Sequence, residues 1–266
     1  MANWNDIKMY DLSIPTGIGT PPWPTYEALQ VKYFKRLTPN GANGQVITTS
    51  NHIGTHLDGP LHFDTAGRDI ASLELTKLCA PGVVVDLSDM MQDFGIYGPD
   101  DMMKRADIRK GDVLIINTGY HKYGWDMPDA DERRYMLRHP GPSMDFVKWC
   151  HDMQFKWLAV DCGSADHPMN TKIRDWEPQE AAACDRLFQE RYGKALNEVY
   201  EWPKTYQAMH LLQFPKKYGE IIHVECVGGQ IDELSNKRCV IGCFPWRFKD
   251  GESAFARVVA FDGFDC

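Results

Sequence analysis

Short apolar stretches recur along the chain after residue 80, each rich in branched side chains and bounded by glycine, aspartate or proline. Their length and composition are typical of buried strands. We therefore expect strands at residues 83–87, 113–117, 157–160, 221–227, 240–244 and 257–261. A further strand is expected at residues 45–50, where it would lead directly into a histidine-rich segment.

Helix-like stretches lie between these strands. Residues 99–106 form one, and residues 143–153 form another, for which Ser143 is a suitable N-cap. The strongest helical stretch is 177–192, which is rich in Ala, Gln, Glu and Arg. Prolines and glycines within residues 13–25 predict a loop instead. Strands alternating with helices predict a mixed α/β fold, and a length of 266 residues suits a single domain spanning 1–266.

One segment, roughly residues 167–206, is more polar than its surroundings and has the character of an insertion. Four large aromatic residues accompany its polar side chains: Trp176, Tyr192, Tyr200 and Trp202. An ordinary surface helix and loop would explain it. A lid or a contact with another subunit would also explain it, because aromatic residues are enriched at interfaces.

Charge and composition exclude several classes of protein. The net charge of −8 argues against a nucleic-acid surface, which needs clustered Lys and Arg. No apolar run approaches the length of a membrane span, and the first eight residues lack the features of a signal peptide. The eight cysteines are scattered without a Cys-x-x-Cys pair. We expect reduced, buried thiols in a cytoplasmic protein whose partner is a small molecule.

The candidate chemistry is concentrated in residues 52–62, where four metal-binding side chains occur within eleven residues: His52, His56, Asp58 and His62. In a straight strand, His52 and His56 would stand about 13 Å apart, too far to bind one ion. In a regular helix, Asp58 would point away from His56.

The segment must therefore bend, and its glycines and proline allow this: Gly54, Gly59 and Pro60. Imidazoles and a carboxylate on a bent loop predict an open metal site with mixed nitrogen and oxygen ligands. Zn²⁺ and Mn²⁺ both accept such ligands. A divalent ion would support hydrolysis of an amide, lactam, lactone or ester, with His62 as the candidate for carrying protons. His62 could instead be a further ligand.

The pattern His52-x-Gly-Thr-His56-x-Asp58-x-Pro-x-His62 resembles the signature of the cyclase family of metal-dependent hydrolases, which includes bacterial kynurenine formamidase and isatin hydrolase. The resemblance extends to Asp11-Leu-Ser13, to Lys110-Gly-Asp112 and to Ala159-Val-Asp161. It implies a swivelling β/β/α architecture and a homodimer or homotetramer.

Residue by residue, the resemblance implies that His52, His56 and Asp58 are metal ligands and that His62 is the catalytic acid/base. It also implies that His210 and Glu225 complete a binuclear site and that Trp23 lines the substrate pocket. The connection between His210 and Glu225 is longer than in the formamidases, so His223 and Glu220 are competitors for the late ligand positions. A strand at 221–227 favours Glu225, since Glu220 would lie outside it.

The preferred function is therefore metal-dependent hydrolysis of a small cyclic amide, imide or lactone, because the long insertion departs from the compact formamidases. Arylformamidase activity on N-formylkynurenine is the alternative. A third hypothesis is a non-catalytic metal-binding protein. A fourth uses no metal: Cys162 or Ser164, which follow a predicted strand, would be a nucleophile, although the Gly-x-Ser-x-Gly motif is missing.

Overall fold

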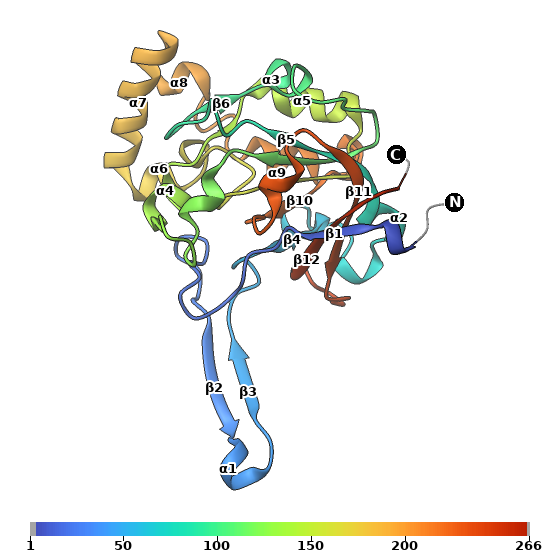
Figure 1. The fold of residues 1–266 in the computed structure, drawn as a ribbon. Coiled ribbons are helices and arrows are strands. Elements are labelled where there is room, and N and C mark those ends of the chain that lie inside the picture. The colour runs from blue at the N-terminus through green and yellow to red at the C-terminus, as the bar shows by residue number, and fades with distance from the viewer. Residues whose placement is uncertain (1–3, 265–266) are drawn as a thin grey trace.

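The computed structural model describes residues 4–264, so residues 1–3 of the amino-terminal segment considered above lie outside the described part. Its main feature is a mixed sheet with the strand order β1-β12-β11-β5-β7-β9-β10-β4. An additional pairing between β12 and β4 closes all of these strands except β1 into a barrel (Figure 1). The strands are β1 (Lys8–Asp11), β4 (His56–Asp58), β5 (Cys79–Asp86), β7 (Val113–Asn117), β9 (Trp157–Val160), β10 (Ile222–Glu225), β11 (Arg238–Pro245) and β12 (Ser253–Asp262).

The barrel has a parallel half and an antiparallel half. Strands β5, β7, β9 and β10 run parallel to one another. All pairings that involve β4, β11 or β12 are antiparallel. The parallel strands are buried on both faces, which explains their continuous apolar sequences. Alternate side chains belong to two separate clusters: Val84, Ile115 and Ala159 pack in the first, while Val85, Ile116 and Val160 pack in the second.

Helices cover the second cluster on the outside of the parallel strands (Figure 1). They are α3 (Pro99–Met103), α5 (Met144–Met153) and α9 (Ala208–Gln213). Ser143 caps α5 by accepting a hydrogen bond from the Phe146 amide. The short pair β6 (Ile96–Tyr97) and β8 (Gly141–Pro142) and the small helix α2 (Leu75–Leu78) lie at the periphery of the sheet.

The segment expected to be an insertion forms α6 (Ile173–Trp176), α7 (Pro178–Tyr192) and α8 (Leu196–Val199). Together with α4 (Glu132–Leu137), these helices build a third apolar cluster that includes Ile173, Phe188 and Tyr200. The four aromatic residues of the segment therefore separate: Tyr200 is buried, Trp202 is half-buried, and Trp176 and Tyr192 are exposed. Neither interpretation of the segment describes all of it, because part of it is core.

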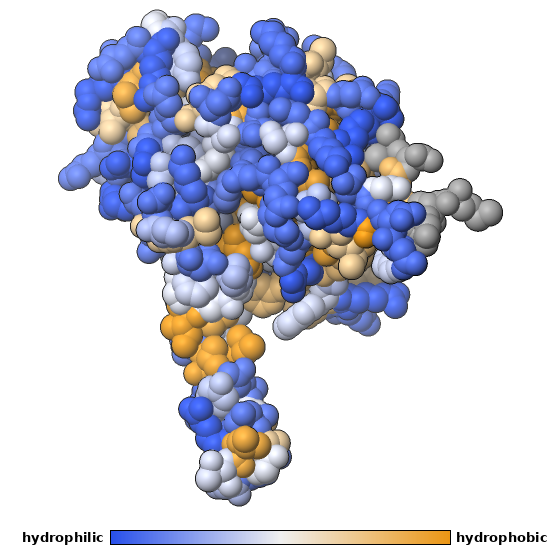
Figure 2. Space-filling view, in the orientation of Figure 1, coloured by the Kyte–Doolittle hydropathy of each residue, from blue (hydrophilic) through white to orange (hydrophobic). Residues whose placement is uncertain are grey.

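A β-hairpin arm projects from the body of the protein (Figure 1). It consists of β2 (Gln30–Lys35), the single turn α1 (Leu37–Asn40) and β3 (Gly44–Thr48), and its two strands form a sheet of their own. The strand expected at 45–50 therefore exists, but it belongs to the arm and not to the barrel. Apolar side chains remain exposed along the arm: Tyr33, Phe34, Leu37, Val46 and Ile47 (Figure 2).

Most of the expected elements are confirmed. Each of the six strands predicted after residue 80 is present, and the helices overlap the three stretches expected to be helical. Residues 13–25 contain only two isolated β-bridges, consistent with a loop. Within residues 4–264, no helix is long and apolar enough to cross a membrane. Six cysteines in this range are free thiols: Cys79, Cys150, Cys162, Cys184, Cys226 and Cys243.

Candidate metal centre

The histidine segment bends at Gly54, as the spacing of its ligands requires. Gly54 has a φ of +60°, and a β-carbon there would lie 2.3 Å from the Thr16 hydroxyl oxygen. Thr55 holds the bend in place, because its hydroxyl donates to the Cys226 carbonyl and accepts from the Ile14 amide. Only glycine meets both the conformational and the steric demand at position 54.

Beyond the bend, β4 runs between β10 and β12 and has His56 and Asp58 two residues apart, on one face. The register places Glu225 of β10 directly opposite His56, so its side chain shares that face. His210 comes from α9, which follows the segment 167–206 in the sequence. Three elements that are distant in the sequence, β4, β10 and α9, therefore bring together the ligand candidates that were predicted from the sequence.

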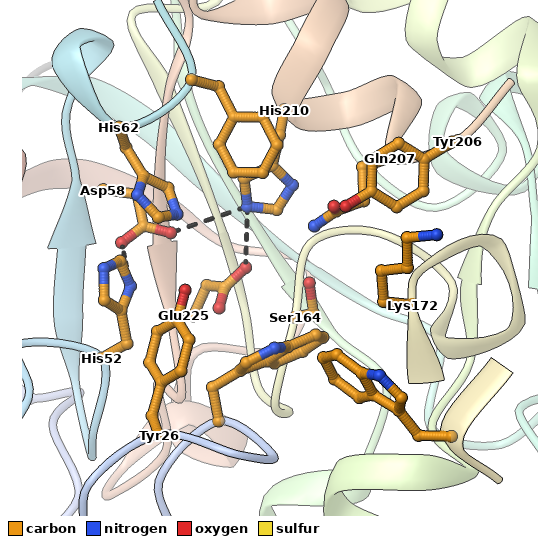
Figure 3. A pocket seen from close by; sticks show the side chains of 13 residues that line it. Tyr26, His52, Asp58, His62, Ser164, Lys172, Tyr206, Gln207, His210 and Glu225 are labelled. Carbon is orange, nitrogen blue, oxygen red and sulfur yellow. Dashed lines mark ion pairs between the residues drawn. The ribbon is translucent and has the colours of Figure 1, made fainter. Parts of the chain in front are cut away.

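Nitrogen atoms of His52, His56 and His210 face the Asp58 and Glu225 carboxylates. Figure 3 marks the ion pairs made by His52 and His210. Asp58 Oδ1 lies 3.0 Å from His52 Nδ1 and 3.4 Å from His56 Nε2. Asp58 Oδ2 lies 3.6 Å from His210 Nε2, which is also 3.6 Å from Glu225 Oε1. The distance from His56 Nε2 to Glu225 Oε2 is 3.8 Å.

The other ring nitrogen of each histidine has a hydrogen-bond partner outside the cluster. His56 Nδ1 donates to the Gly54 carbonyl at 2.8 Å, and His210 Nδ1 donates to Asp166 at 2.6 Å. His52 Nε2 lies 2.9 Å from Glu252. Such outer hydrogen bonds fix the ring orientation and tautomer of metal-binding histidines.

The donor set fits a divalent cation. Both Asp58 oxygens and His56 Nε2 are buried and have no hydrogen-bond partner among the described residues, an expensive arrangement unless something else satisfies them. His52, His56 and Asp58 form a group whose ligand atoms all lie within 4.8 Å of one another. These are residue types that Zn²⁺ and Mn²⁺ accept.

The electrostatics of the cluster agree with this fit. Burial raises the pKa of Glu225, and the neighbouring Asp58 charge raises it further, to about 8. Burial would lower the pKa of His52 and His210, but nearby carboxylates outweigh it and raise each to about 10. Without a bound cation, protons on Glu225, His52 and His210 compensate the negative charge of the two buried carboxylates. A divalent ion would displace these protons.

His62 follows β4 on a short 3₁₀ helix, Pro60–His62. Its Nδ1 lies 2.7 Å from Glu252 Oε2, and its ring centroid is 4.3 Å from that of His52. His62 also forms a group with Asp58 and His210 whose ligand atoms lie within 4.8 Å. Its position is compatible both with carrying protons and with binding metal, so the geometry leaves the two interpretations of this residue open.

Glu252 and Asp166 are site residues to which sequence reasoning assigned no contact with the histidines. Glu252 contacts both His52 and His62, and it is held by a hydrogen bond from the Ser253 hydroxyl. It precedes the final strand by one residue, about 200 positions from the histidines, with no local pattern to mark it. Asp166 accepts from the amides of Met209 and His210 as well as from the His210 ring.

The competing late residues are engaged elsewhere. Glu220 forms an ion pair with Arg68 at 2.6 Å, outside the cluster. His223 is buried beside His210, but its Nε2 binds Gln213 Oε1 at 2.9 Å. No group of three converging ligand atoms among residues 4–264 includes either residue. Glu225 is not in such a group either, but its carboxylate lies 3.8 Å from His56 and 3.6 Å from His210.

A cavity of about 150 Å³ opens next to the cluster, and Trp23 lies in its wall. Other aromatic residues join it there: Tyr26, Phe63, Trp176 and Tyr206. A cavity of about this volume in an apolar core holds benzene, so the space suits one planar ring with small substituents. Figure 3 shows His52 and Tyr26 on one side of the cavity and Tyr206, Gln207 and Lys172 on the other.

The geometry disfavours a cysteine or serine nucleophile. Burial raises the pKa of Cys162 well above its usual value, so the thiolate is suppressed. Ser164 lines the cavity, but its hydroxyl accepts from the Asp166 amide and has no histidine partner among the described residues. A nucleophilic serine needs such a base.

Comparison with known proteins gives a consistent result. Residues 10–167, more than half of the chain, match the family model described as "Putative cyclase". The kynurenine formamidase of Bacillus cytotoxicus is 30% identical over 188 residues, covering 71% of this chain and 78% of the relative. The kynurenine formamidase of Bacillus anthracis is 25% identical over 186 residues, covering 68% and 77%.

Among solved structures, isatin hydrolase A from Ralstonia solanacearum superimposes with a TM-score of 0.74, covering 97% of this chain and 92% of that one at 17% identity. An isatin hydrolase bound to the product analogue thioisatinate gives a TM-score of 0.75 at 16% identity, covering 98% and 94%. At these identities the likeness concerns the fold, and it confirms the α/β cyclase-like architecture expected from the sequence.

Proposed function

The chain belongs to the cyclase family, and from this premise we propose that it is a metal-dependent hydrolase acting on a small cyclic amide, imide or lactone. The reaction would add one water to the ring carbonyl: hydroxide bonds to carbon, the C–N or C–O bond breaks, and a proton passes to the leaving atom. The relatives with hydrolase names support this proposal at the level of amide-bond hydrolysis.

One observation carries the proposal: two buried carboxylates face three histidine nitrogens, and neither Asp58 oxygen has a hydrogen-bond partner among the described residues. His52, His56 and Asp58 would hold one ion, and His210 and Glu225 would complete a site for a second, with Asp58 between them. A bound divalent ion lowers the pKa of water from about 15.7 to about 7 and polarises a carbonyl. Zn²⁺ and Mn²⁺ are both compatible with this set.

His62 would supply the proton that a nitrogen leaving group needs. Its Nδ1 lies 2.7 Å from Glu252 Oε2 in an ion pair, which would leave Nε2 as the atom that takes and returns a proton. Glu252 orients the ring in the way that a carboxylate orients a catalytic histidine in other hydrolases. A non-catalytic metal-binding protein would have no use for this pair.

Arylformamidase activity is the second candidate, since curated relatives are named kynurenine formamidase. The small cavity favours the cyclic substrates, because a single planar ring fills the space between the aromatic walls.

Trp23 would bind the planar face of the substrate. Its backbone amide donates to the His52 carbonyl, which ties the loop to the histidine segment. Trp23→Ala should raise KM about tenfold with little change in kcat, because a stacking surface binds substrate and transition state alike. The matched control is Trp246→Ala, which removes a tryptophan that is 66% exposed and does not line this cavity. Steady-state kinetics decide the matter: a lowered melting temperature with unchanged kinetics would make Trp23 a loop anchor.

The proposed function is tested by turnover. Purified protein loaded with Zn²⁺ or Mn²⁺ should open a cyclic amide, imide or lactone from a panel that also contains isatin and N-formylkynurenine. Preference for N-formylkynurenine would favour the arylformamidase alternative. Absence of turnover across the panel would favour the non-catalytic alternative.

We also propose that the protein assembles as a homodimer or homotetramer. The support is the projecting arm, whose exposed Phe34, Leu37 and Ile47 would be costly to leave in water. Monomeric proteins rarely leave several large apolar side chains exposed on an isolated hairpin.

A further inference from the structure

Gln207 is a buried amide without a protein partner. Its residue is only 8% exposed, and neither side-chain amide atom has a hydrogen-bond partner among the described residues. It lines the cavity beside the metal-ligand candidates, and Figure 3 shows its amide pointing inwards. A buried polar group that faces a cavity and lacks a partner is available to a ligand.

The backbone at Gln207 explains how the amide is kept free. Gln207 is the N-cap of α9 with a φ of 41°, in the left-handed region that a long side chain rarely adopts. Its side chain makes no capping hydrogen bond. Asp166 caps the helix instead, accepting from the amides of Met209 and His210. An unfavourable backbone conformation at a cavity wall is typical of a functional position.

Ser164 adds a second free donor next to Gln207. The residue is 2% exposed, and its side-chain oxygen accepts from the Asp166 amide at 3.3 Å. Its hydroxyl proton has no acceptor among the described residues. In Figure 3, Ser164 points into the cavity between Glu225 and the Gln207 side. This wall therefore offers donors from both residues and one acceptor, the Gln207 carbonyl.

A glutamine amide pairs with a group that presents a donor and an acceptor side by side. In a cyclic imide, the ring locks the N–H and the second carbonyl on one edge, so Gln207 Oε1 can accept from the N–H while Nε2 donates to that carbonyl. The first carbonyl would remain free to face the metal cluster. A lactone has no N–H, and an open-chain formamide has no ring that locks such an edge.

We propose that Gln207, assisted by Ser164, forms hydrogen bonds with the N–H and the second carbonyl of a cyclic imide. These hydrogen bonds would make the site select imides over lactones of the same shape. This inference rests on the proposed hydrolase function. It goes further by naming the group that is recognised and the residue that recognises it.

The test compares Gln207→Met with the parent protein on matched pairs: succinimide with γ-butyrolactone, and phthalimide with phthalide. Methionine keeps the length of the side chain and makes the same backbone demand but offers no amide. We expect kcat/KM for the imides to fall about 10- to 100-fold, as for the loss of two hydrogen bonds, and for the lactones to change less than about threefold. Gln207→Asn, which tolerates the left-handed conformation better, should give the same pattern. Gln179→Met, at an exposed position on α7, is the control.

Binding separates this inference from the proposed function. Isothermal titration of the parent protein with phthalimide and with phthalide, with and without Zn²⁺, should show tighter binding of phthalimide, and Gln207→Met should remove the difference. Selective binding without turnover would uphold the role of Gln207 and refute the hydrolase proposal. Equal losses for imides and lactones, or no selectivity in the parent protein, would overturn the inference and leave hydrolysis untouched.

Discussion

Asp58→Asn should bind almost no metal and lose activity by at least about a thousandfold, because several kcal/mol of stabilisation of the transition state depends on the bound ion. Asp58 is the residue that all three facing histidines approach. Asparagine keeps its shape but removes the charge and directs an N–H towards nitrogen atoms. Elemental analysis and kcat/KM measure the two effects.

Thermal unfolding of the metal-free variant distinguishes loss of metal binding from loss of the fold. Metal-free Asp58→Asn should unfold at a lower temperature than the metal-free parent, because it breaks the buried ion pairs of Asp58 with His52 and His210. A single cooperative unfolding transition would show that the variant still folds. Asp64→Asn is the matched control, since Asp64 follows the same segment and, among the described residues, its side chain accepts only from the Ala66 amide. Full metal content with full activity in Asp58→Asn would refute the assignment.

His62→Ala should retain its metal and lose about 10²- to 10⁴-fold in kcat, the usual contribution of a positioned acid/base. The loss should be larger for amides than for esters with good leaving groups, because nitrogen leaves only after it receives a proton. The 2.7 Å contact with Glu252 is what orients the ring for this task.

The competing interpretation, that His62 is a ligand, makes a different prediction for the same protein. A large loss of metal affinity in His62→Ala, measured by titration with Zn²⁺, would assign His62 to the ligand set with Asp58 and His210. His151→Ala serves as the control, because His151 stacks on Tyr218 and does not line the cavity. Unchanged kinetics in His62→Ala would remove the residue from the mechanism.

The parallel half of the barrel could be predicted from the sequence because its strands are buried on both faces. Residues 113–117 and 157–160 are apolar nearly throughout, and such runs are recognised as buried strands from the sequence alone. β4 is different: its three residues, His56–Asp58, carry ligands and contain no apolar alternation. The strand at 45–50 was predicted from its β-branched residues, but a local pattern does not reveal whether a strand joins the barrel or an exposed arm.

The candidate site was predictable to the extent that its residues are neighbours in the sequence. His52, His56 and Asp58 lie close enough for spacing alone to suggest a shared ion. Glu252 and Gln207 could not be found in this way, because their roles depend on strand pairing and on the left-handed start of α9. Hydrogen bonds that fix a histidine tautomer leave no periodic signal in a sequence.

The most direct test of a divalent-metal hydrolase is a metal titration of the chelated parent protein, followed by its turnover of the best substrate. We expect chelation to abolish turnover and Zn²⁺ or Mn²⁺ to restore it, with activity reaching its maximum at two ions per chain if His210 and Glu225 hold the second. A maximum at one ion would remove that second site while preserving the first. Full turnover by protein shown to be free of metal would contradict the account.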